Sequence, residues 1–139
     1  MTARSPLNWA PRWLQQEVEQ RVPRQIRAVP EDFGGRNEQM EQAAAAMRSG
    51  ASRLITITGL SGAGKSVLAC AIANALYRLF HGGHIFIDLH GTALEPLPTT
   101  TAMQHVVRAL APDARNVENE AELEGLYRSL LAERQVVLL

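Results

Sequence analysis

Eight residues near the middle of the chain carry the clearest chemical pattern. Residues 59–66 read Gly-Leu-Ser-Gly-Ala-Gly-Lys-Ser, which matches the phosphate-binding (Walker A) pattern G-x-x-x-x-G-K-[ST]. Its glycines let the backbone turn tightly and point successive N–H groups at phosphate oxygens. Lys65 suits the β- and γ-phosphates as a point charge, and the Ser66 hydroxyl suits a bridging Mg²⁺ ion. The pattern therefore predicts a magnesium nucleoside triphosphate as ligand.

The loop residues other than Leu60, together with Val67 after the loop, form the predicted phosphate site. Lys65 and Ser66 are the residues expected to act in any catalysis, and Ser66 is the expected metal ligand. Lys65 is also the one lysine of the chain, beside thirteen arginines. A compact ammonium fits this place better than a planar guanidinium. The predicted phosphate-binding residues are Gly59, Ser61, Gly62, Ala63, Gly64, Lys65, Ser66 and Val67.

The segments on either side of the loop have the pattern that a phosphate loop requires. Residues 54–58, Leu-Ile-Thr-Ile-Thr, predict a β-strand, and residues 66–80 predict a helix that is apolar nearly all round. A helix of that kind is buried. Its positive N-terminal end adds to the attraction for a phosphate.

The rest of the chain alternates helices and strands. Helices are expected at 37–48 and 100–110 and after Asn119, whose side chain starts a capping pattern with Glu122. Strands are expected at 85–89 and 136–139. This order predicts an α/β fold, the three-layer P-loop NTPase fold, with an incomplete parallel sheet of about three strands.

Two regions are expected along the chain. Residues 1–30 contain four prolines and predict an N-terminal leader or linker with a short helix at 13–21. Residues 31–139 predict a partial P-loop NTPase domain. The last strand resembles a Walker B strand, but the acidic residue that should follow it is missing, so we expect the chain to be a fragment of a longer protein.

The net charge and the cysteine count argue against several classes of protein. The formal net charge is zero, so no global field favours nucleic acid or an anionic membrane. Cys70 is the single cysteine, which excludes an internal disulfide and favours a reducing compartment. No signal peptide or membrane-spanning run is recognisable, and a cytoplasmic location is expected.

Together these segments resemble the nucleotide-binding domain of NB-ARC or STAND signalling ATPases, above all the bacterial regulators that often carry tetratricopeptide repeats. The resemblance covers about residues 30–139. It rests on the segment Asp-Phe-Gly-Gly-Arg at 32–36, similar to the F-x-G-R segment of the family, and on the phosphate loop and the later strands and helix. Gly34 and Asn37 depart from the family pattern, which more often has a branched apolar residue and a glutamate there.

The resemblance implies several properties. Phe33, Gly35 and Arg36 would lie at the base and ribose of ATP or ADP. Family members switch between ADP-bound closed and ATP-bound open states, and they pass the signal on by homo-oligomerisation. Protein partners would bind through C-terminal regions that this chain lacks, and hydrolysis by the chain alone is expected to be weak or absent.

Two other functions remain open on the sequence. A P-loop phosphotransferase for a small hydroxyl substrate is one, because Asp88 ends the strand after the loop helix, where an acid could accept a proton or join a magnesium shell. A remnant without independent function is the other, because an unfinished sheet exposes its last strand.

Overall fold

The computed structural model describes residues 11, 22–114 and 116–139. The helix predicted at 13–21 lies outside these residues. The described helices occupy the predicted places, since helical hydrogen bonds are local and follow from the sequence pattern. In chain order the elements are α2 (Asn37–Arg48), α3 (Lys65–Ala75), β1 (Gly83–Ile85), α4 (Thr99–Leu110), α5 (Glu120–Ala132) and β2 (Val136–Leu138).

A short parallel sheet occupies the centre of the described chain. β1 pairs with β2 in parallel, with Gly83 opposite Val136 and Ile85 opposite Leu138. The pairing continues past both strands, because Leu139 N donates to Ile85 O at 2.9 Å and Ile87 N donates to Leu139 O at 2.7 Å. The strand predicted at 136–139 is β2. The strand predicted at 85–89 is shifted, because β1 begins two residues earlier, at Gly83, and ends at Ile85.

The third predicted strand, at residues 54–58, is not part of this sheet. Its side chains still alternate: Ile55 and Ile57 pack against the core, whereas Leu54 is 78% exposed. An alternating pattern fixes which side chains are buried, but a strand also needs a neighbouring backbone to bond to. In the described structure, β2 bonds only to β1, so the predicted three-stranded sheet is here two-stranded.

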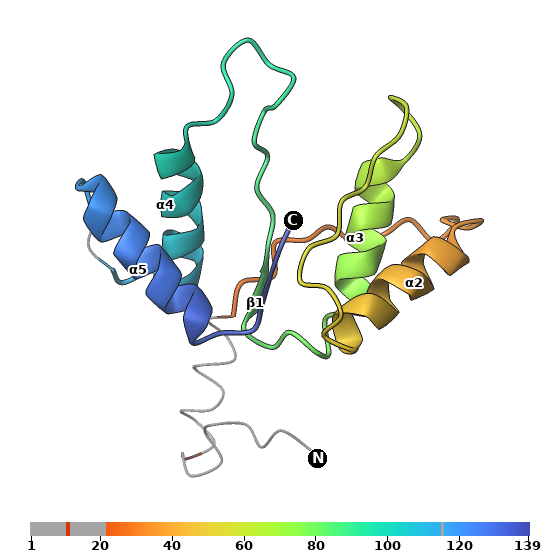
Figure 1. Ribbon diagram of the computed structural model, residues 1–139, viewed down its shortest axis with the longest axis horizontal. Coiled ribbons are helices and arrows are strands. Elements are labelled where there is room, and N and C mark those ends of the chain that lie inside the picture. Colours follow the sequence, from red (N-terminus) through yellow and green to blue (C-terminus); the bar gives the residue numbers. More distant parts are fainter. Residues whose placement is uncertain (1–10, 12–21, 115) are drawn as a thin grey trace.

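Helices lie on both sides of β1 (Figure 1), and each side has its own apolar core. On one side, α2 and α3 enclose Ala44, Leu68, Ile72 and Leu76. On the other, Ile85 of β1 packs with Val106 and Leu110 of α4, against apolar residues of α5. The helix predicted at 66–80 ends at Ala75, followed by turns.

The start of α5 confirms the predicted cap. Asn119 is the N-cap residue, and its side-chain oxygen accepts a hydrogen bond from Glu122 N at 3.1 Å. Such a bond satisfies one of the free N–H groups of the first turn. Over the ranges that the structure describes, none of the helices is both long and apolar enough to cross a membrane.

Candidate phosphate-binding site

The glycine loop has the backbone conformation that its composition predicts. Gly62 and Gly64 both have a φ of 76°, in the left-handed region that favours glycine. A Cβ at either position would meet no atom within 4 Å, so the loop surface beside them is open. Gly64 is the N-cap residue of α3, which starts at Lys65. The free N–H groups of that first turn therefore lie directly beside the loop.

Lys65 closes the loop with its own side chain. Its Nζ donates to the carbonyl oxygens of Gly59 at 3.0 Å and Leu60 at 2.6 Å. Gly59 has a φ of 155°, which other residues rarely adopt, and a Cβ there would be in ordinary van der Waals contact with the Lys65 side chain, 3.8 to 3.9 Å away. A single flexible cation is thus held at the mouth of the loop, where it can exchange carbonyl oxygens for phosphate oxygens.

Arg36 reaches the same loop from a distant part of the chain. Its Nη2 donates to the carbonyl oxygen of Ala63, 27 residues later in the sequence. Gly35, just before it, has a φ of 80° and leads the chain into α2. The segment expected at the base and ribose is therefore joined to the phosphate loop through Arg36.

The other predicted residues lie around this centre. Phe33 is half-buried and packs against the core between α2 and α3. Ser61 and Ser66 are exposed, on the loop and in the first turn of α3, and Val67 is partly buried. Open glycines, an exposed hydroxyl and a lysine at a helix N-terminus form a donor set that fits the phosphates of a nucleotide and a Mg²⁺ bound to them. Ser66 would hold that ion, and Lys65 would hold the phosphates.

Asp88 is engaged in a local turn. Its Oδ1 accepts a hydrogen bond from His90 N at 2.9 Å, and the carboxylate is exposed. His90 has a φ of 51°, in the left-handed region. These contacts give Asp88 a structural role in the loop after β1, and they supply no support for the phosphotransferase alternative.

The sequence did not single out His84 as a buried group. It lies in β1, is 3% exposed, and its Nε2 has no hydrogen-bond partner. The Tyr77 ring packs edge-on against its ring, with centroids 5.1 Å apart. Burial, and after it the positive charge of Arg24, lowers the pKa of His84. His84 directly precedes the strand predicted at 85–89, so no signal of its burial was available in the sequence beyond its place next to an apolar run.

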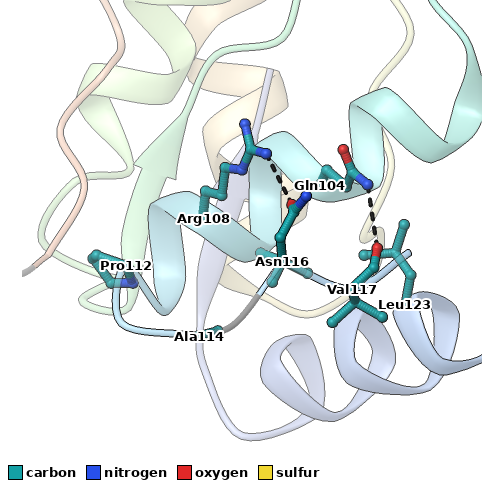
Figure 2. Close-up of a pocket in the computed structure, with 8 residues that line it drawn as sticks. Gln104, Arg108, Pro112, Ala114, Asn116, Val117 and Leu123 are labelled. Carbon is teal, nitrogen blue, oxygen red and sulfur yellow. Dashed lines mark hydrogen bonds between the residues drawn. The ribbon is translucent and has the colours of Figure 1, made fainter. Parts of the chain in front are cut away.

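A cavity of about 170 Å³ lies between α4 and the loop that leads into α5 (Figure 2). Arg108 donates to Asn116 Oδ1 at 2.9 Å, and Gln104 donates to the carbonyl oxygen of Val117 at 3.3 Å. Both bonds tie the loop to α4. The polar side chains that line this cavity are therefore already engaged, Arg108 with the Asn116 side chain and Gln104 with the backbone of the loop.

The comparisons with known proteins point to regulators. The chain is 30% identical over 126 residues to the regulatory protein AfsR of Streptomyces coelicolor. This alignment covers 84% of the present chain and 13% of AfsR. It is 27% identical over 121 residues to AfsR of Streptomyces griseus, covering 84% and 12%. The chain is therefore homologous to a segment of these regulatory proteins, and it spans about an eighth of their length. It matches no protein-family model and no solved structure.

Proposed function

We propose that this chain is the nucleotide-binding part of a regulatory switch protein, and that it binds ATP or ADP with Mg²⁺ at residues 59–66. The observation that carries the proposal is the placement of Lys65 Nζ at the carbonyls of a glycine loop, at the N-terminus of α3. A ligand phosphate at this place gains the lysine charge, the loop N–H groups and the helix dipole together.

The regulatory half of the proposal comes from the relatives. Two proteins that align with 84% of this chain are named as regulatory proteins. In a signalling or transcription regulator, a nucleotide site is most useful as a switch whose two ligand states differ in shape. We propose that the P-loop fold and the NB-ARC or STAND class apply to this segment, with slow hydrolysis, and with oligomerisation and protein partners belonging to the full-length protein.

Arg36 supports a site that extends beyond the phosphates. Its bond to Ala63 joins the segment 32–36 to the loop, so a ligand bound at the loop also lies near Phe33, Gly35 and Arg36. These residues would bind the base and ribose. We therefore expect binding to depend on the base as well as on the phosphates.

Competition binding tests this proposal. A fluorescent ATP analogue is bound to the chain in the presence of Mg²⁺ and displaced with ATP, ADP or GTP. We expect ATP and ADP to displace it at concentrations about tenfold lower than GTP, a difference of about 1.4 kcal/mol in binding free energy. Equal displacement by ATP and GTP would count against an adenine-nucleotide switch, and no binding of the analogue would reject the proposal altogether.

A further inference from the structure

Residues 23–27, called the strap below, occupy the edge of β1 opposite to β2. Gln25 N donates to His84 O at 2.9 Å, and His84 N donates to Pro23 O at 2.8 Å. Arg24 and His84 form a parallel bridge. An extended segment added to a sheet edge gains its affinity from such main-chain bonds. The strap was expected to be a linker, because Pro23 and Pro30 interrupt any regular pattern there.

The strap also binds the helix layer on one side of the sheet. Gln25 Oε1 accepts a hydrogen bond from Phe86 N at 3.3 Å and lies 3.0 Å from Nε2 of His105 in α4. One side chain therefore connects the strap, the extension of β1 and α4.

On the other side the strap binds α3, and Figure 1 shows the segment crossing from β1 to that helix. Asn74 Nδ2 donates to the carbonyl oxygen of Arg27 at 3.0 Å. The guanidinium carbon of Arg24 lies 5.1 Å from the centre of the Tyr77 ring, a cation–π distance. Asn74 and Tyr77 are at the C-terminal end of α3, and Lys65 is at its N-terminal end. The strap therefore holds one end of the helix whose other end forms the phosphate site.

The strap is held by polar and exposed contacts, which can open without disrupting either apolar core. Arg24, Gln25 and Arg27 are exposed, and a cavity of about 230 Å³ remains between the strap, α3 and His84. Neither of the two apolar cores includes a strap residue. Segments with few buried apolar contacts open at a lower free energy than the core does.

We propose that docking of the strap on α3 and β1 is coupled to nucleotide binding at the phosphate loop. This inference rests on the proposed nucleotide binding. The loop and the strap contact opposite ends of α3, a helix of 11 residues. A ligand that orders the N-terminal end of α3 lowers the entropy cost of ordering the rest of the helix, and this favours docking of the strap at the other end. Coupling of this kind is reciprocal: bound nucleotide stabilises the docked strap, and the docked strap raises nucleotide affinity by the same factor.

Limited trypsin digestion of the 139-residue chain tests the coupling. Trypsin cleaves after Arg24 and Arg27 only when the strap is undocked, and cleavage after Arg128 in α5 reports opening of the other core. We expect saturating MgATP to slow strap cleavage about fivefold relative to cleavage after Arg128. Asn74→Ala should speed strap cleavage and weaken ATP binding measured by calorimetry. Gln42→Ala removes an exposed helical amide of α2 and should change neither.

The outcomes separate this inference from the proposed function. If ATP binds, but strap cleavage is unchanged by ATP and Asn74→Ala binds ATP as tightly as the wild type, the coupling is wrong and nucleotide binding stands. If the wild-type strap is cleaved as fast as that of Asn74→Ala, the hydrogen bond from Asn74 does not hold the strap on α3, and coupling through that contact is wrong. If calorimetry detects no ATP binding, both proposals are overturned.

Discussion

At the scale of single residues, the candidate site depends on two cations that bind the backbone of one loop. Lys65 binds the carbonyls at the start of the loop, and Arg36 binds the carbonyl of Ala63 near its end. The first is a mobile ammonium suited to change partners, and the second is a planar group suited to hold a fixed geometry. We infer that Lys65 contacts the phosphates and that Arg36 positions the loop.

Substitution of Arg36 tests its positioning role. Arg36→Ala leaves the Ala63 carbonyl without its charged partner, so the loop must be ordered by the ligand itself. A hydrogen bond to a charged group contributes about 1.5 kcal/mol or more, so we expect ATP affinity to fall about tenfold or more. Arg53→Ala, which removes another cation close to the loop in sequence, should leave the affinity unchanged. Calorimetric titration measures the ATP affinity of both variants. Equal affinities would show that Arg36 does not position the loop.

At the scale of elements, the helices could be predicted and the sheet only in part. The predicted helix at 37–48 has those bounds, α4 starts one residue earlier than predicted, and Asn119 caps α5 as expected. Each of these features depends on residues within a few positions of one another. Whether residues 54–58 and the strap join a sheet depends on which distant segment of backbone lies beside them. Neither the periodicity nor the composition of the sequence contains that information. The candidate phosphate loop was recognisable from the sequence, whereas the contact between Arg36 and Ala63 required the structure.

The strap and β1 fit together at Gly83. A Cβ at this position would lie 2.6 Å from Cγ of Pro23, and Gly83 has a φ of 134°, where other residues are strained. Gly83→Ala should therefore lower the free energy of unfolding by about 1 to 3 kcal/mol.

Gly125→Ala is the matched control, because Gly125 lies inside α5 with open space around it. That variant should gain about 0.5 to 1 kcal/mol from helix propensity. Urea unfolding of both variants measures the difference, and a neutral Gly83→Ala would contradict the observed packing.

At the scale of the whole molecule, two apolar cores are joined by polar and aromatic contacts. The core of α2 and α3 and the core of β1, α4 and α5 have no buried residue in common. Between them lie the strap, the edge contact of Tyr77 with His84, and a cavity. Contacts of this kind open at a lower free energy than an apolar core does, which is consistent with the proposed switch.

The buried His84 makes the junction of the two halves sensitive to pH. Its pKa is lowered in the folded state, so below about pH 6.5, its ordinary value, the unfolded chain binds more protons than the folded chain. The free energy of unfolding should therefore decrease as the pH falls from 7 towards 5. Arg24, which faces the ring, opposes protonation as well.

Urea unfolding at several pH values measures this dependence. His84→Leu should reduce the loss of stability between pH 7 and pH 5, whereas His81→Gln, which changes an exposed histidine three residues away, should keep it. An equal loss in the wild type and His84→Leu would show that His84 is not the responsible group.

Calorimetric titration of MgATP into the wild-type chain and into Lys65→Ala tests nucleotide binding most directly. We predict one site in the wild type and an affinity at least about tenfold lower in Lys65→Ala, because a phosphate at the loop would lose its charge-assisted partner. Arg48→Ala, which removes an exposed cation from α2, should bind as the wild type does. Equal affinity of the wild type and Lys65→Ala, or no measurable binding to the wild type, would contradict the assignment of residues 59–66 as a nucleotide site.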